Sequence, residues 1–257
     1  MEKKTEQNIA LAAFFQENNR VALAFSGGVD SSYLLYEAIR QGVKIQPYYV
    51  KSAFQPEFEY QDALRLAKEL GAELKVIHVD VLASKQVTAN PANRCYYCKD
   101  CIFSTILKEA AKDGYEVILD GTNASDDAAD RPGMQALCEM KVRSPLRECG
   151  LTKKHIRQLS KQAGLFTWDK PAYACLATRI PTGEEITREK LEATEAAESF
   201  LFSQGFSDFR VRFLKGCARI QLPHDQLSLL LEKRQLILET LKRDYQGVVL
   251  DLETRGE

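Results

Sequence analysis

Apolar and polar positions divide the first two thirds of the chain into alternating predicted strands and helices. Short apolar runs typical of buried strands lie at 21–25, 44–50, 74–79 and 116–120. Between them, apolar residues recur at helical spacing, most clearly over 58–70 and 103–111. Thr152 is predicted to cap a further helix that ends before Gly164. This rhythm favours an α/β fold, in which helices cover both faces of a parallel sheet.

The pattern changes near residue 185, where we expect a second and smaller domain. The predicted elements there are a helix over 187–204, strands at 209–213 and 218–222, a helix over 227–244 and a strand at 248–252. These elements form an α+β module with a sheet of its own. We therefore expect one domain over residues 1–185 and a second, for substrate binding or oligomerisation, over residues 186–257.

The most informative polar segment directly follows the first predicted strand. It reads Ser26-Gly27-Gly28-Val29-Asp30-Ser31-Ser32 and leads into a predicted helix. Backbone N–H groups bared by the glycines, the serine hydroxyls and the helix N-terminus would converge on one anion, such as a phosphate. The segment lacks the lysine of a Walker A sequence and carries Asp30, whose carboxylate suits a site where Mg²⁺ bridges it to phosphates. An ordinary strand-to-helix turn is the alternative interpretation.

This segment resembles the PP-loop of the ATP pyrophosphatases, which split ATP into AMP and pyrophosphate while adenylating a substrate. The resemblance implies ATP and Mg²⁺ as cofactors and gives Asp30 a catalytic role. The residues that it implies for nucleotide binding are Ser26, Gly27, Gly28, Asp30, Ser31 and Ser32.

Three other places near the same sheet edge offer groups for nucleotide binding. The loop 121–127 follows a predicted strand, and we expect its Gly121 and Asn123 to close over nucleotide or substrate. Arg143 could supply a bidentate phosphate contact, and Lys170 a point charge. The alternatives are a solvated turn for the loop and surface roles for the two basic residues.

Composition is that of a soluble enzyme and excludes several other classes. The chain has 257 residues, of which 45% are apolar, so it can bury a substantial core. The net charge of −1 gives no general attraction to nucleic acid, and we expect no nucleic-acid partner. Neither a signal peptide nor a membrane-spanning run is visible, so we expect a cytoplasmic protein.

Seven cysteines are many for a cytoplasmic chain, and their odd number argues against a disulfide framework. Cys95, Cys98 and Cys101 follow one another at intervals of three just before a predicted helix, whose N-terminus would stabilise thiolates. With no second CxxC, an iron–sulfur cluster on three thiolates fits better than a closed zinc site. Two buried cysteines and a stray one are the alternative.

Another cysteine lies in a basic segment towards the end of the first predicted domain. Cys175 stands between Lys170 and Arg179, where an exposed thiol would have a lowered pKa and be nucleophilic or metal-binding. Further along, Arg210 and Arg212 alternate with an apolar residue on a predicted strand, so both project to one face. A solvated strand face is the alternative interpretation of this pair.

Taken together and in order, these segments resemble the LarE family, ATP-dependent sulfur transferases that build the nickel-pincer nucleotide cofactor. The most discriminating segment is Lys170-Pro171-Ala172-Tyr173-Ala174-Cys175-Leu176-Ala177-Thr178-Arg179. The resemblance also rests on the PP-loop and on residues 93–99, 121–123 and 210–212. It covers nearly the whole chain.

The resemblance implies a reaction in two parts. A carboxylate of a pyridinium dicarboxylate mononucleotide is adenylated with release of pyrophosphate, and sulfur then displaces AMP to leave a thiocarboxylate. It makes Arg179, Arg210 and Arg212 substrate-binding residues, and paired guanidiniums suit a phosphate. It also implies a homo-oligomer.

Two sources of sulfur occur in the family. In one branch the cysteine matching Cys175 gives up its own sulfur and becomes dehydroalanine. In the other, three cysteines matching Cys95, Cys98 and Cys175 hold a 4Fe–4S cluster whose extra sulfide is transferred, with a sulfide donor as a possible partner. We favour the cluster-bearing branch, and the spacing leaves Cys101 open as a ligand.

Three other functions compete with this one. A tRNA thiolase of the PP-loop class would need a basic RNA surface, which neither the net charge nor any Lys/Arg-rich segment provides. An amide-forming ligase that uses ammonia would leave the cysteines idle. A cysteine-based redox sensor would not need Asp30 and both loop glycines.

Overall fold

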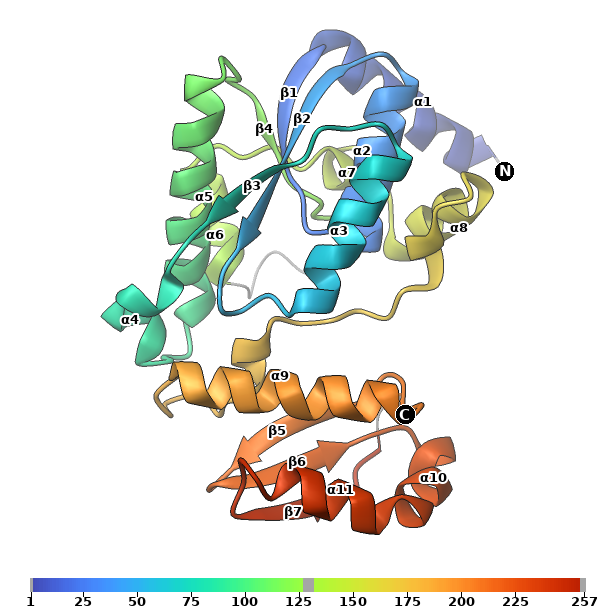
Figure 1. Cartoon of the computed structure of the whole chain (residues 1–257). Helices are drawn as coiled ribbons and strands as arrows, with labels where there is room; N and C mark the ends of the chain where they lie inside the picture. The colour runs from blue at the N-terminus through green and yellow to red at the C-terminus, as the bar shows by residue number, and fades with distance from the viewer. Residues whose placement is uncertain (1, 127–131, 255–257) are drawn as a thin grey trace. The chain divides into compact units, whose positions relative to one another are not determined.

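The computed structural model describes residues 2–126 and 132–254, which form two compact units (Figure 1). The first unit takes the described residues within Met1–Asp80 and Asn93–Ala172, and the second takes those within Val81–Ala92 and Tyr173–Glu257. The division at Ala172 differs from the expected boundary near residue 185, and the segment Val81–Ala92 was not expected in the second unit.

Hydrogen bonds of Asn90 explain why an early segment belongs to the later unit. This segment holds η1 (Val81–Ala83) and α4 (Lys85–Thr88). The side-chain amide of Asn90 donates to the carbonyl of Pro181 at 2.8 Å, and the N–H of Gly183 donates to the carbonyl of Asn90, also at 2.8 Å. Such long-range pairing leaves no local pattern in the sequence.

The first unit is built on a four-stranded sheet in the order β3-β2-β1-β4, and every pairing in it is parallel. The strands are β1 (Arg20–Ala24), β2 (Lys44–Lys51), β3 (Lys75–His78) and β4 (Ile118–Leu119). The predicted α/β fold with a parallel sheet is therefore confirmed. β4 is shorter than the predicted run 116–120, because only its two residues pair with β1.

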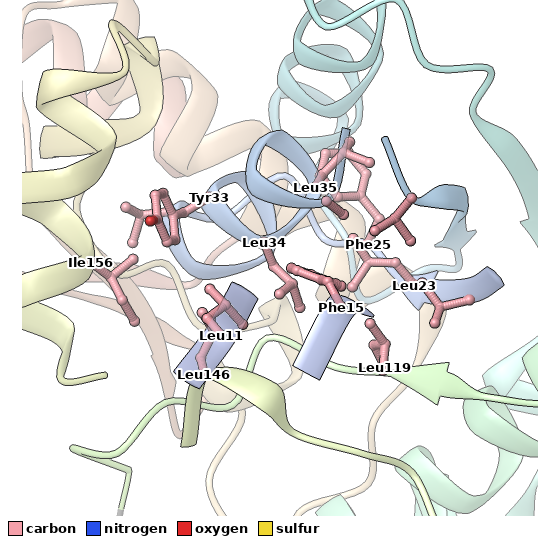
Figure 2. Packing of buried hydrophobic residues seen from close by; sticks show 14 of the residues in the cluster. Leu11, Phe15, Leu23, Phe25, Tyr33, Leu34, Leu35, Leu119, Leu146 and Ile156 are labelled. Atoms are coloured by element: carbon pink, nitrogen blue, oxygen red, sulfur yellow. The ribbon is translucent and has the colours of Figure 1, made fainter. Parts of the chain in front are cut away.

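Helices cover both faces of this sheet, as the sequence predicts. They are α1 (Glu2–Glu17), α2 (Val29–Arg40), α3 (Glu57–Glu69), α5 (Arg94–Lys112), α6 (Pro132–Glu139), α7 (Pro145–Glu148) and α8 (Lys153–Gln162), with the 3₁₀ turn η2 (Phe166–Asp169). Leu23 packs with Phe15 of α1 and Leu34 of α2 (Figure 2), whereas its neighbour Ala22 packs on the other face with Ile106 of α5. Alternate residues of β1 thus enter two separate clusters.

The second unit is a small α+β module, also as predicted. Its sheet has the order β5-β6-β7, with β5 (Arg210–Leu214) antiparallel to β6 (Cys217–Gln221) and β6 parallel to β7 (Gly247–Leu250). α9 (Arg188–Ser203), capped by the Thr187 side chain, packs against β5. The 3₁₀ turns are η3 (Leu176–Arg179) and η4 (His224–Gln226).

The predicted helix 227–244 is divided in the structure. It forms α10 (Leu227–Glu232) and α11 (Arg234–Leu241), which meet at Lys233. No glycine or proline stands at this break, so the sequence gives no sign of it. Among the residues described, no helix has the length and apolarity needed to cross a bilayer.

Candidate functional site

The PP-loop-like segment has the geometry that its residues predict. β1 ends at Ala24 and α2 begins at Val29, so the loop joins the two directly. Ser31 Oγ lies 3.1 Å from Ser26 Oγ and donates to the carbonyl of Gly28 at 3.2 Å, which ties the loop to the first turn of the helix. Gly28 is the N-cap and has no side chain to satisfy the first N–H groups of α2, so these remain available to an anion.

A cavity of about 320 Å³ opens at this loop. Its volume falls in the range of small-molecule sites. Of the residues predicted to bind nucleotide, Ser26, Gly28, Asp30, Ser31 and Gly121 line it. Gly27 and Ser32 do not. Gly27 instead adopts a φ of +71° with Ala63 of α3 close behind it, and Ser32 is fully buried.

The two carboxylate oxygens of Asp30 differ in their hydrogen bonding at this cavity. Its Oδ2 accepts a hydrogen bond from Lys153 Nζ at 2.5 Å, whereas its Oδ1 is buried and accepts none from any described residue. Burial raises the pKa of Asp30, and the Lys153 ammonium works against that rise. The open, buried oxygen fits a Mg²⁺ ligand.

The described residues do not by themselves enclose a metal ion. No three histidine, cysteine, aspartate or glutamate side chains among them converge in a metal-binding arrangement. This agrees with the usual way in which proteins bind Mg²⁺ at phosphates, where one or two carboxylates and the phosphate oxygens share the ion.

The second loop lies against the first. A Cβ on Gly121 would stand 3.0 Å from the backbone nitrogen of Ser31, so any larger residue would push the two loops apart. Asp120 anchors the loop by accepting hydrogen bonds from Thr122 Oγ1 at 2.5 Å and Ser144 Oγ at 2.6 Å. Asn123 does not line the cavity. It is buried, and its amide donates to Asp126 at 2.9 Å, so it shapes the loop. Asp127 lies outside the described residues.

Two basic residues expected near phosphates have carboxylate partners instead. Arg143 pairs with Glu148 of α7 at 2.5 Å and covers the ring of Phe14. Lys170 pairs with Asp62 of α3 at 2.7 Å. Neither lines the cavity, so the structure places both in ion pairs of the first unit rather than at the nucleotide site.

Two lysines that the sequence did not single out stand at this site. Lys99 of α5 lines the cavity, and Lys153 at the start of α8 reaches Asp30. Both are far from the loop in sequence, and their neighbours match no phosphate-binding pattern. Only the fold brings them there.

The CxxCxxC segment lies within a helix, not before one. α5 begins at Arg94, so Cys95, Cys98 and Cys101 occupy its first turns and lie three residues apart along one side. Cys95 is exposed, whereas burial, aided by the Asp100 charge, raises the pKa of Cys101 above its usual value. The expected stabilisation of thiolates therefore does not extend to Cys101.

In the second unit, Glu198 of α9 joins the segments that carry the remaining candidates. Its buried carboxylate accepts hydrogen bonds from Arg179 Nε at 2.8 Å, from the Tyr173 hydroxyl and from the Val211 N–H of β5 at 2.9 Å. Burial raises the pKa of Tyr173, and the Glu198 charge adds to the rise. Glu198 could not be singled out from the sequence, because it stands in an ordinary amphipathic helix.

The three arginines expected at the substrate lie on the two segments that Glu198 joins, and Arg179 is the one that pairs with its carboxylate. Arg179 is only 1% exposed, and its guanidinium also donates to the carbonyl of Ala174, next to Cys175. Arg210 is buried over the ring of Tyr173, and Arg212 Nη1 donates to the carbonyl of Thr178 at 2.8 Å. The structure thus places all three arginines against residues 173–178, the segment that carries Cys175.

The sequence of the chain is similar to those of known proteins over nearly its whole length. No family model matches the chain. It is 38% identical to an uncharacterized protein of Synechocystis over 98% of this chain and 95% of that protein. It is 32% identical to the pyridinium-3,5-bisthiocarboxylic acid mononucleotide synthase of Lactiplantibacillus plantarum over 94% of this chain and 89% of that enzyme.

The chain belongs to the LarE family. A weaker match, at 27% identity over 40% of the chain, is the tRNA-specific 2-thiouridylase MnmA of Fervidobacterium nodosum. Both named relatives are sulfur-transferring enzymes, and the 2-thiouridylase match points to the PP-loop superfamily. The protein is therefore a LarE-type, ATP-dependent sulfur transferase, and its PP-loop implies ATP and Mg²⁺.

Proposed function

We propose that this protein adenylates a carboxylate of a pyridinium dicarboxylate mononucleotide and converts it to a thiocarboxylate for nickel-pincer cofactor synthesis. The observation that carries the proposal is the cavity at the PP-loop, where Asp30 Oδ1 stands open beside the uncapped end of α2. The full-length similarity to a LarE-type synthase supports the substrate class.

In this reaction the first unit binds ATP. The N–H groups at the start of α2 and the hydroxyls of Ser26 and Ser31 hold the phosphates, and Asp30 supplies a metal ligand. Bound Mg²⁺ neutralises charge on the phosphates. A carboxylate oxygen of the substrate displaces pyrophosphate from the α-phosphate, and sulfur then displaces AMP.

The second unit supplies the substrate contacts and Cys175. Arg210 and Arg212 share one face of β5 and hold the substrate phosphate as charged donors. Arg179 acts in a different way, because its guanidinium pairs with the buried Glu198. It positions the segment around Cys175 through the Ala174 carbonyl.

We also propose the cluster-bearing form of the reaction, in which Cys95, Cys98 and Cys175 hold a 4Fe–4S cluster. Support comes from the CxxC spacing and from the exposure of Cys95 at the start of α5. The described residues bring no three such ligands together. No step of the reaction is therefore assigned to the cluster.

We also propose that the protein is a cytoplasmic homo-oligomer and that a donor supplies it with sulfide. Seven cysteines fit the reducing cytoplasm, and the similarity to a LarE-type enzyme supports the need for sulfide.

Pyrophosphate release and iron content test the proposal. Protein purified without oxygen should release pyrophosphate from ATP when the pyridinium dicarboxylate mononucleotide is added, and form a thiocarboxylate product. The cluster-bearing form adds bound iron and acid-labile sulfide, both lost in Cys95→Ala and Cys98→Ala. Stoichiometric zinc without iron in active protein would exclude the cluster.

The similarity to 2-thiouridylases favours a tRNA thiolase as the second candidate function. Undermodified tRNA serves as the competing substrate in the same assay. Release of pyrophosphate with tRNA, and none with the mononucleotide, would replace the first proposal by the second.

A further inference from the structure

Lys153 joins the two loops of the nucleotide cavity. It is the first residue of α8, directly after the Thr152 cap. Its N–H donates to Ser125 Oγ of the second loop at 3.0 Å, and its Nζ donates to Asp30 Oδ2 at 2.5 Å. Its backbone is therefore fixed to one loop, while its flexible side chain reaches the other.

Carboxylates outnumber lysines among the side chains that line the cavity. Asp30, Asp120 and Asp126 line it together with Lys99, so phosphates would enter a site that Lys99 alone does not neutralise. The positive charge of Arg157 also opposes the rise that burial causes in the pKa of Asp30. Its guanidinium, however, donates to the carbonyls of Trp168 and Lys170, both at 2.7 Å, so it is held in place. The Lys153 ammonium is instead held by a single carboxylate oxygen and is one third exposed.

A metal ion on Asp30 would change that arrangement. A divalent cation at Oδ1 would stand on the same carboxylate as the Lys153 ammonium, and two like charges a few ångströms apart repel each other strongly. Lysine carries a compact charge on a long, flexible stem, so it can move to a nearby phosphate without any change in the backbone.

We propose that Lys153 is a phosphate-binding lysine of this site and supplies, beside Lys99, the charge that the loop itself lacks. Before nucleotide binds, it neutralises Asp30. When the Mg²⁺ nucleotide enters, Asp30 exchanges the ammonium for the metal, and Lys153 contacts the phosphates that leave as pyrophosphate. This inference rests on the proposed ATP-dependent function and extends it to a residue outside the loop.

Comparison of ATP with AMP tests the assignment, because AMP lacks the phosphates that Lys153 is proposed to contact. Dissociation constants for each nucleotide with Mg²⁺ are measured by titration calorimetry on the full chain. We expect Lys153→Met to weaken ATP binding by on the order of tenfold or more, as for the loss of one charge-assisted contact, and to leave AMP binding unchanged. Lys154→Met, at the exposed neighbour on the same helix, should match the wild type.

Two further variants separate the charge of Lys153 from its packing. Lys153→Arg keeps the charge and should restore most of the ATP affinity. Lys153→Gln can still donate to Asp30 and serves if the methionine variant fails to fold; it should lose ATP affinity as the methionine variant does.

The outcomes are distinct. Unchanged ATP binding in both uncharged variants overturns the assignment, and so does an equal loss for ATP and AMP, which would make the ion pair purely structural. Failure of the wild type to bind ATP would instead refute the proposed function itself.

Discussion

Asp30 shows how one side chain can serve two states of a site. Its carboxylate is largely buried, and an uncompensated buried charge is costly. Lys153 meets one oxygen and leaves the other open towards the cavity. The ion pair stabilises the empty site, and the open oxygen is ready for a metal. The sequence showed the carboxylate, but not the lysine that neutralises it.

The first prediction concerns this carboxylate. Asp30→Asn keeps the shape of the side chain but removes its charge, so Mg²⁺ loses its anionic ligand and ATP cleavage should be abolished. Pyrophosphate release is the measurement, with circular dichroism to check the fold. Release at the wild-type rate would remove the metal role of Asp30.

The local burial of each cysteine also decides how readily its thiol loses a proton. Burial raises the pKa of Cys149 to about 11 and that of Cys101 above its usual value, while Cys95 is exposed. A thiol reacts as its thiolate, so raising the pKa lowers reactivity at a given pH. At pH 8, a pKa of about 11 leaves roughly one Cys149 in a thousand as thiolate.

These differences predict an order of alkylation in protein without bound iron. With iodoacetamide at pH 8, Cys95 should be modified well before the half-buried Cys101 and Cys149, and these two thiols should react faster as the pH rises. Peptide mass spectrometry over a time course gives the rates. Labelling of Cys101 as fast as Cys95 would contradict its assignment as a half-buried thiol and restore it as a candidate ligand.

At the scale of elements, the sequence predicted the alternation of strands and helices but not all of their ends. The start of α5 was misplaced because Cys95 to Cys101 break the apolar periodicity that marked the helix from residue 103. α8 was placed correctly, since Thr152 and Gly164 are strong local signals. Partners such as Lys153 and Glu198 lie far from the segments that they hold, and no local pattern encodes such contacts.

α9 stabilises the second unit through Glu198, and this contact can be tested. The Arg179–Glu198 pair is 1–2% exposed, and removing one partner of a buried pair leaves the other charge uncompensated. Glu198→Gln should therefore lower the free energy of unfolding by about 3–5 kcal/mol.

Urea denaturation of the full chain measures this loss. Glu192→Gln, at an exposed position of the same helix, is the matched control and should change stability by less than about 0.5 kcal/mol. If both variants unfolded at the same urea concentration, the buried pair would have no structural role.

At the scale of the whole molecule, the candidate groups are divided between the two units. The nucleotide cavity, Cys95 and Cys98 belong to the first unit, and Cys175 with the three arginines belongs to the second. The sequence predicted these residues and their order along the chain, but it placed Cys175 and Arg179 in the first domain, which was expected to end at residue 185. The sequence could not show that Val81–Ala92 belongs to the second unit, because this depends on the hydrogen bonds of Asn90 with Pro181 and Gly183.

The source of the sulfur is a property of this whole assembly, and the last prediction concerns it. Both routes need sulfur at position 175, so Cys175→Ala and Cys175→Ser should adenylate the substrate yet form no thiolated product, since a hydroxyl neither transfers sulfur nor ligates iron well. Retained adenylation in these variants would show that the first unit works without the cysteine.

Mass spectrometry after a single turnover then separates the two routes. If a cluster-bound sulfide is transferred, Cys175 keeps its mass, and the enzyme turns over repeatedly when sulfide is supplied. If Cys175 gives up its own sulfur, each chain acts once, and residue 175 loses the mass of H₂S to become dehydroalanine. We expect the first result, because the sacrificial route gives no purpose to Cys95 and Cys98 at the start of α5. Dehydroalanine at position 175 would overturn that choice and leave those two cysteines without a part in the reaction.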